Sequence, residues 1–338
     1  MFKRKSKVGD ILDIIILLML VMTMFILPSF ASIISIIGNI LMCVIAYRSN
    51  IVKSIGCVIT TYAFMVIFGF LGNSFSLMHL FDCAISTFNF LLIGLSIGTL
   101  CRLTGEISKI LIGGTLSNLV IISLEIIRYR IVYTGSVMEA LVNQPVKEFI
   151  SAYENAVSAS GIDFTEMFGA SMEDAVWALQ QSVGMIVPAL LILSSLAIAY
   201  LVYIIFKKLL GMYNVKLYTK NFDEFGLPAG ASIALVVSYV ITMFSSSTFG
   251  AACANILIIL TTLYVICGFS VVEYKFKSKI RLAVFRWILY FVILFITSFL
   301  SILLPFFNVI TLLMIIGMFD GVYDFRKLRK IQTNEEEE

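Results

Sequence analysis

The charged residues of this chain are gathered into a few clusters, and long apolar runs fill the sequence between them. Only 13% of the residues are charged and 60% are hydrophobic, whereas a soluble domain has about 25% charged residues. This pattern predicts an all-α, polytopic membrane protein whose solvent is the lipid bilayer. The net charge of +3 is too small to indicate a nucleic-acid partner.

The longest apolar runs are too long for a single crossing. As one helix, residues 11–46 would extend roughly 54 Å, against a hydrocarbon core of about 30 Å. We therefore expect a bend at Pro28, and a second bend at Pro305 within the run 283–322. The remaining predicted segments are 54–72, 81–101, 110–133, 183–206, 229–246 and 251–272. The total is eight to ten spans, because 30–46 and 229–246 can be full crossings or re-entrant segments.

The basic residues predict the orientation of these spans. When the loops alternate from an inner N-terminus, only Arg128, Arg130 and Lys147 of the 24 Lys and Arg residues fall outside. This asymmetry follows the positive-inside rule and predicts that both termini are cytoplasmic. The basic start and first apolar run also resemble a secretory signal, but we expect an uncleaved first span.

One long loop, residues 134–182, is predicted to lie outside. It contains seven acidic residues and one lysine. Its apolar residues follow helical spacing, which predicts an amphipathic helix; they are Val146, Phe149, Ile150, Tyr153 and Val157. The helix is either a lid over an external entrance or a connector on the lipid headgroups.

The order of these features predicts four regions. Residues 1–133 form an N-terminal membrane bundle of five apolar segments, and 134–182 form the acidic external loop. Residues 183–325 form a C-terminal bundle of five segments, and 326–338 form a charged cytoplasmic tail.

Polar residues within the apolar runs are the candidates for substrate binding. Glu125 and Arg128 are three residues apart on one predicted helix and lie near its outer end. They are either part of a substrate site below the loop or a structural ion pair. Asn89 and Asn118 lie deeper, where an amide either binds substrate or forms an interhelical hydrogen bond.

The last apolar run ends in a cluster of charges. Asp320 and Asp324 are four residues apart and are expected to share a helix face, with Arg326 following them. These three residues either contact a partner protein or pair with one another and with nearby basic residues.

The common motifs of enzymes and metal sites are missing. The sequence contains no Walker loop, no H-E-x-x-H and no G-x-S-x-G. Its six cysteines form no C-x-x-C pair, and it has one histidine, His79. We therefore expect no enzyme activity, no metal site and no cofactor.

Three stretches together resemble a known family. They read MIVPALLILSSLAIAYLVYIIFKKLL at 185–210, FDEFGLPAGASIAL at 222–235 and MFDGVYDFRKLRK at 318–330. In this order they resemble the YybS-like family of predicted bacterial membrane proteins (domain of unknown function 2232). Asp320, Asp324 and Arg326 match that family's closing pattern. The N-terminal half of the family also looks remotely similar to the substrate-binding S components of energy-coupling-factor transporters.

This resemblance implies a transporter-like membrane protein that binds a small molecule. The alternative is a non-transporting scaffold or regulatory subunit that recruits a cytoplasmic partner. The expected surroundings in both cases are the lipid bilayer, with a small-molecule ligand or a cytoplasmic or membrane protein as the partner.

Overall fold

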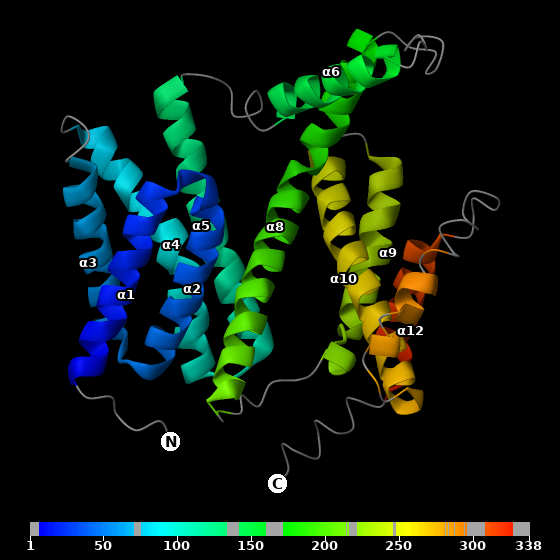
Figure 1. Ribbon diagram of the computed structural model, residues 1–338. Helices are drawn as coiled ribbons and strands as arrows, with labels where there is room; N and C mark the ends of the chain where they lie inside the picture. The colour runs from blue at the N-terminus through cyan, green and yellow to red at the C-terminus, as the bar shows by residue number, and fades with distance from the viewer. Residues whose placement is uncertain are drawn as a thin grey trace. The chain divides into compact units, whose positions relative to one another are not determined.

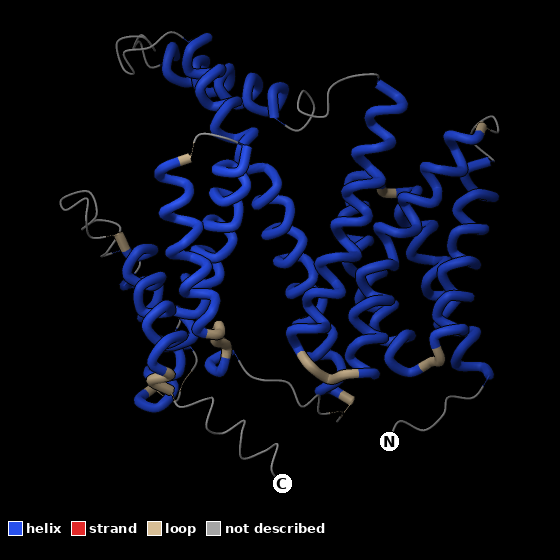
Figure 2. The backbone as a smooth tube through the Cα atoms, turned by 180° about the vertical axis from the view of Figure 1, so that it is seen from behind, coloured by secondary structure: helices blue, strands red, loops and turns tan. Residues whose placement is uncertain are grey.

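The computed structural model describes residues 7–70, 76–133, 142–159, 172–213, 215, 222–245, 248–280, 282, 284–286, 288–293, 295 and 308–326. These residues form helices and turns and contain no strand, which confirms the predicted all-α class (Figures 1 and 2). The helices are α1 (Lys7–Ile26), η1 (Pro28–Phe30), α2 (Ala31–Arg48), α3 (Ile51–Phe70), α4 (Leu77–Leu103), α5 (Ile107–Tyr133), α6 (Gln144–Ala159), α8 (Met172–Met212), η3 (Phe222–Glu224), α9 (Ala229–Phe244), α10 (Thr248–Lys279) and α12 (Val309–Tyr323).

The predicted membrane segments correspond to helices wherever the structure describes them; within the predicted run 283–322, residues 296–307 lie outside the described part of the chain. By length and composition, six helical stretches are long and apolar enough to cross a membrane: Pro28–Arg48, Ile51–Phe70, Leu77–Leu103, Ile107–Val132, Val176–Met212 and Thr248–Lys279. Three shorter apolar helices, Ile11–Ile26, Ala229–Phe244 and Val309–Tyr323, match further predicted segments. A polytopic membrane bundle is therefore confirmed.

The first long apolar run folds back where proline predicts it. Helix α1 ends at Ile26, and Pro28 opens the short helix η1 before α2 begins at Ala31. Proline suits the first turn of a helix because its missing N–H would have no partner there. The second predicted bend, at Pro305, lies outside the described residues.

The chain divides into two compact units. Unit 1 comprises residues 1–184 and 190–219, and unit 2 comprises residues 185–189 and 220–338. Helix α8 belongs to both units, because its residues 185–189 pack in unit 2. The predicted bundles 1–133 and 183–325 follow the order of the sequence and differ from these two units. That division stays a prediction.

A close pair of parallel helices forms the centre of unit 1. A Cβ atom at Gly94 of α4 would lie 2.0 Å from the carbonyl oxygen of Asn39 in α2. At Gly98, a Cβ would lie 2.4 Å from the carbonyl oxygen of Cys43. The two backbones therefore touch, and this contact is the use that membrane helices make of a G-x-x-x-G spacing.

Unit 2 contains a pair of the same kind, α10 and α12. A Cβ at Gly268 would lie 2.0 Å from the carbonyl oxygen of Leu313, and one at Gly317 would lie 2.2 Å from that of Tyr264. Gly268 thus faces the carbonyl group four residues before Gly317, and Gly317 faces the carbonyl group four residues before Gly268. This reciprocal pattern sets the register, in which residue 268 is level with residue 317.

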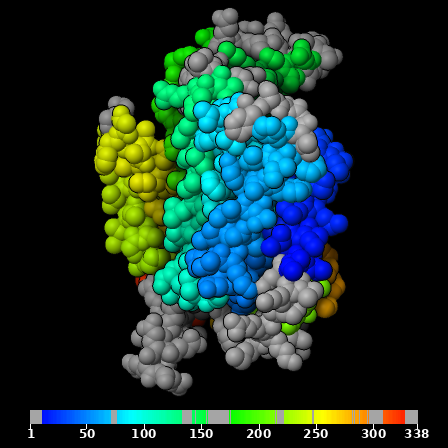
Figure 3. All heavy atoms as spheres, turned by 90° about the vertical axis from the view of Figure 1, so that its left-hand side faces the viewer, coloured from blue at the N-terminus to red at the C-terminus, as the bar shows by residue number. Residues whose placement is uncertain are grey.

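The outward surfaces of unit 1 are suited to lipid. Figure 3 shows the face formed by α1, α3, α4 and α5. Exposed side chains on α1 and α3 include Met19, Ile26, Val52, Ile59 and Ile67, each more than 60% exposed. A soluble protein rarely exposes so large a continuous apolar surface, whereas a bilayer solvates it.

Helix α6 occupies the loop segment in which an amphipathic helix is predicted. It runs across the direction of the longer helices in both views of the backbone (Figures 1 and 2). Val146 and Ile150 are buried, whereas Phe149 of the same predicted stripe is 65% exposed. The helix is confirmed, and its position outside the membrane stays a prediction.

An asparagine completes helix α8 at its internal proline. Pro188 interrupts the helix between Met185 and Ala189. The side-chain amide of Asn255 donates to the carbonyl oxygen of Met185 at 2.8 Å, and its oxygen accepts from the N–H of Ala189 at 2.9 Å. Asn255 thus supplies partners to backbone groups that hydrocarbon would leave unsatisfied.

Candidate functional site

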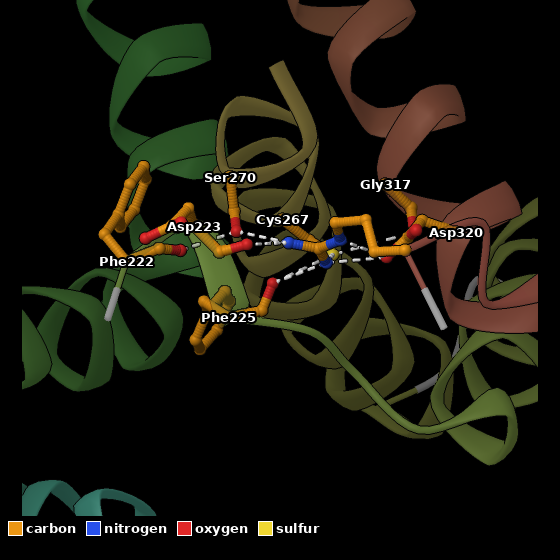
Figure 4. Close-up of polar contacts among 8 residues, drawn as sticks. Phe222, Asp223, Phe225, Cys267, Ser270, Gly317 and Asp320 are labelled. Atoms are coloured by element: carbon orange, nitrogen blue, oxygen red, sulfur yellow. Dashed lines mark hydrogen bonds and ion pairs between the residues drawn. The ribbon is translucent and has the colours of Figure 1, made fainter. Parts of the chain in front are cut away.

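The end of α12 contains a buried arginine with every donor in use. Arg326 is 3% exposed. Its Nη1 donates to the carbonyl oxygen of Asp223 and to Ser270 Oγ, both at 2.7 Å. Its Nη2 donates to the carbonyl oxygen of Phe225 at 2.8 Å and to Asp320 Oδ2 at 2.6 Å, and its Nε donates to the same oxygen at 3.1 Å. These bonds account for all five guanidinium N–H groups (Figure 4).

The local backbone explains how Arg326 reaches this position. Helix α12 ends at Tyr323, and Asp324 adopts the left-handed conformation with φ 48°. This residue turns the chain back, and its N–H donates to the carbonyl oxygen of Asp320 at 2.8 Å. The structure therefore corrects one expectation: Asp324 lies beyond the helix end and does not share a helix face with Asp320.

The FDEFGLP stretch, residues 222–228, supplies further hydrogen-bond partners of Arg326. Its first residues form η3, and the carbonyl groups of Asp223 in η3 and of Phe225 just after it accept hydrogen bonds from Arg326 (Figure 4). A Cβ at Gly226 would lie 3.3 Å from Arg326 Nη2, so the small residue leaves room for the guanidinium. Pro228 then serves as the N-cap of α9.

Two further polar contacts lie beside the hydrogen bonds of Arg326. Ser270 Oγ donates to the carbonyl oxygen of Phe222 at 2.6 Å. Lys277 Nζ lies 2.8 Å from Asp223 Oδ2, at the more exposed side of the cluster. The second carboxylate oxygen of Asp320, Oδ1, is buried and has no hydrogen-bond partner in the described part of the chain. We refer to Arg326, Asp320, Asp223, Phe225 and Ser270 as the arginine cage.

The cage joins two of the stretches that resemble the family, which lie about one hundred positions apart in sequence. Of the two alternatives for the closing charges, the structure has the pair between Asp320 and Arg326. Both residues are nearly fully buried, so they offer little surface to a partner. Asp324 is only partly buried, and its contact with a partner stays a prediction. Sequence reasoning did not identify Asp223, Phe225 or Ser270 as partners of Arg326.

The predicted charges of unit 1 lie at one end of α4 and α5. Arg128 of α5 pairs with Asp82 of α4, with Nε 2.5 Å from Oδ1 and Nη2 3.3 Å from Oδ2. Glu125 is exposed on the same helix, three residues before Arg128. Sequence reasoning considered an ion pair of Arg128 with Glu125 and did not identify Asp82 as its partner.

The predicted amide residues lie in different surroundings. Asn118 is buried, and its Nδ2 donates to Ser195 Oγ of α8 at 2.9 Å. The side chain of Asn89 is exposed, and the main-chain carbonyl oxygen of this residue accepts a bond from Asn39 Nδ2 at 2.8 Å. Asn39 Oδ1 also accepts from the N–H of Gly94 at 2.8 Å. Asn39 therefore joins α2 to α4, and sequence reasoning did not identify this residue.

A matched pair of asparagine variants tests whether Asn39, and not Asn89, joins α2 to α4. Asn39→Ala should lower the free energy of unfolding of unit 1 by about 1–2 kcal/mol, because the carbonyl oxygens of Ser35 and Asn89 and the N–H of Gly94 each lose a partner within the bilayer. Asn89→Ala, which removes an exposed amide, should change it by less than about 0.5 kcal/mol. Thermal unfolding of the full chain in mild detergent measures both. Equal losses in the two variants would contradict the assignment.

Titratable side chains do not gather elsewhere in the described residues into a metal site. The described chain holds no group of three or more His, Cys, Asp or Glu side chains with that geometry. The six cysteines are buried and free. That the protein uses no metal or cofactor stays a prediction.

Comparison with known proteins identifies the family. No curated protein and no solved structure matches the chain. The model of one family, described as a predicted membrane protein of domain of unknown function 2232, matches residues 14–320 and so covers nearly all of both units. This chain is a multi-pass integral membrane protein that belongs to the domain of unknown function 2232 family.

Proposed function

We propose that the protein is a transporter-like membrane protein of the bacterial inner membrane, in which unit 1 binds a small polar molecule without acting as an enzyme. The observation that carries this proposal is the half-exposed pair of Asp82 and Arg128 between α4 and α5. Glu125 adds a second carboxylate close to the same guanidinium. A transporter-like role also agrees with the remote resemblance that we infer from the sequence between the family's N-terminal half and transporter S components.

The geometry favours a ligand that carries both an acidic and a basic group. The described contacts of Arg128 use Nε and Nη2, so Nη1 has donors for a carboxylate or phosphate of the ligand. Glu125 is exposed and can accept a bond from an amine. The Asp82–Arg128 pair is about half-exposed, so a polar ligand can reach both charges.

Native mass spectrometry of the full chain, extracted gently from its own membrane, tests this proposal. We expect a small molecule to remain bound, and Arg128→Met to reduce its occupancy about 10- to 100-fold through loss of a charge-assisted hydrogen bond. Arg130→Met is the matched control, because Arg130 is also exposed on α5 and should leave occupancy unchanged. Absence of any ligand, or equal loss in both variants, would contradict the proposal.

The arginine cage favours a second candidate, a scaffold that recruits a cytoplasmic partner. The cage holds the turn at 222–225, α10 and the chain just after α12 in one arrangement. Asp324 lies in the turn that ends α12 and is only partly buried, so it offers a polar group at a fixed place to a partner protein. A partner that co-purifies with the wild-type chain and is lost on Asp324→Ala would support this candidate over ligand binding.

A further inference from the structure

Helix α8 has a weak point where Pro188 interrupts it. Proline has no N–H, so the carbonyl oxygen of Gly184 receives no bond from the residue four positions later. The groups of the next such pair, the carbonyl of Met185 and the N–H of Ala189, both bond to the side chain of Asn255. Regular helical bonding is therefore interrupted by proline at one position and supplemented by another helix at the next.

Asn255 can release α8 and still have a partner. Its Nδ2 also donates to the carbonyl oxygen of Ala251, one turn earlier on α10, at 2.9 Å. When Asn255 releases α8, the carbonyl of Met185 and the N–H of Ala189 have the spacing of a regular helical bond and can bond to each other. The break thus has two arrangements that satisfy these polar groups, which is what a hinge in a membrane helix requires.

The two parts of α8 on either side of the break differ in packing. The inner part, residues 190–212, belongs to the core of unit 1. Its side chains Val202 and Phe206 are fully buried, and Ser195 accepts a hydrogen bond from Asn118 of α5. In the outer part, none of the described side chains between 174 and 184 is buried. Packing therefore holds the inner part in place much more firmly than the outer part.

The break lies near the outer edge of the hydrocarbon core. Lys207 and Lys208 mark the cytoplasmic end of α8 by the positive-inside rule. Pro188 precedes Lys207 by 19 residues, which is about 29 Å of helix, and the hydrocarbon core is about 30 Å thick. Residues 172–187 of α8 therefore extend about 24 Å beyond the core.

Helix α6 is attached to this outer part of α8. Gln180 Nε2 donates to the carbonyl oxygen of Asn143, just before α6, at 3.3 Å. Both views of the backbone show α6 beside the first turns of α8 (Figures 1 and 2). We refer to α6 and residues 172–184 of α8 as the outer arm.

We propose that Pro188 and Asn255 form a hinge about which the outer arm swings as one piece relative to the rest of unit 1. A bend of about 20°, the lower limit for a sharp kink, moves the far end of an arm about 24 Å long by about 8 Å. The arm follows α5 in sequence, so it is a movable cover attached at the end of α5 that holds Arg128. Its use as a cover for a ligand rests on the proposed function, whereas the hinge itself does not.

Distances between pairs of spin labels on the full chain in lipid nanodiscs test the hinge. The native cysteines are buried, so the labels are attached to cysteines introduced at exposed positions. Ser151→Cys on α6 with Leu116→Cys on α5 spans the hinge, and Leu201→Cys with Leu116→Cys is the control pair inside it. We expect the first distance distribution to be wider than the second by about 8 Å. Ser151→Cys with Ala178→Cys, both in the arm, should be as narrow as the control.

Two variants separate a hinge from a rigid arm. Pro188→Ala supplies the missing N–H and should narrow the first distribution to the width of the control. Asn255→Ala leaves only the direct bond between Met185 and Ala189 and should also narrow it. A wild-type distribution as narrow as the control, a width unchanged by Pro188→Ala, or equal broadening within the arm would overturn the inference.

The same samples report on folding. Two labels per chain in every variant show that the native cysteines stay buried. The measurement contains no ligand, so the hinge can fail while the proposed ligand site stands, and the ligand site can fail while the hinge stands.

Discussion

Arg326→Met should lower the free energy of unfolding of unit 2 by about 3–5 kcal/mol, the range for breaking a buried ion pair on one side. The substitution leaves the carboxylate of Asp320, which is 4% exposed, without its partner. It also removes the donors to the carbonyl oxygens of Asp223 and Phe225. Arg326→Lys keeps the charge but has three donors in place of five, so it should lie between the wild type and methionine.

The native cysteines allow this effect to be located within the chain. Cys267 and Cys253 are buried in unit 2, whereas Cys43 and Cys101 are buried in unit 1. Arg326→Met should raise the rate at which a small thiol reagent labels Cys267 by about 10²–10³-fold, in proportion to the open fraction of unit 2. Labelling of Cys43 should not change. Mass spectrometry of peptides after short pulses of reagent measures each cysteine separately.

Two further variants separate the charge effect from simple loss of packing. Arg326→Met combined with Asp320→Leu removes both charges, and it should recover part of the lost stability, because no unpaired carboxylate remains. Lys277→Met removes the half-exposed partner of Asp223 and should cost at most about 1 kcal/mol. A double variant less stable than Arg326→Met, or a loss at Lys277 as large as at Arg326, would show that burial of the pair is not what stabilises the cage.

The helices were predictable from sequence because the thickness of the bilayer limits how a long apolar run can be arranged. A hydrocarbon core of about 30 Å and a rise of 1.5 Å per residue determine how long an apolar run can be before it must end or fold back. The expected segments 81–101 and 110–133 lie within α4 and α5. The expected segment 183–206 likewise lies within α8, which spans Met172–Met212.

The partners of the charged residues were not predictable in the same way. Helical spacing relates a residue only to neighbours three or four positions away. On that basis Glu125 was the expected neighbour of Arg128, yet its partner Asp82 lies 46 positions earlier. Arg326 likewise bonds to carbonyl groups 103 and 101 positions earlier. Every residue has a backbone carbonyl, so the sequence does not indicate which carbonyl groups bind Arg326. Only the order of the family motifs indicated that these stretches are related.

The left-handed turn at Asp324 shows a second limit. A pattern of carboxylates at positions 320 and 324 suggests one helix face, and it does not reveal that the helix ends between them. Asparagine and aspartate tolerate this conformation better than most residues, so Asp324 is a suitable residue for the turn. The tendency is too weak to predict the helix end by itself.

The helix-pairing glycines lead to the last prediction. Gly94→Ala places a Cβ 2.0 Å from the carbonyl oxygen of Asn39, and Gly268→Ala places one 2.0 Å from that of Leu313. The obstacle in each case is backbone, so whole helices must separate, and contacts along the pair are lost with them. We expect each substitution to lower the free energy of unfolding of its own unit by about 3 kcal/mol, the upper end for overpacking.

Matched glycines and cysteine labelling give this prediction its control. Gly56 of α3 and Gly230 of α9 have no atom within 4 Å of a new Cβ, so Gly56→Ala and Gly230→Ala should be neutral or slightly stabilising. Gly94→Ala should speed labelling of the four unit 1 cysteines, Cys43, Cys57, Cys83 and Cys101, and Gly268→Ala should speed labelling of Cys253 and Cys267 in unit 2, with the cysteines of the other unit unchanged. If Gly94→Ala also exposed Cys267, the two units would unfold as one, and the glycine pairs would stabilise the whole membrane domain instead of two separate bundles.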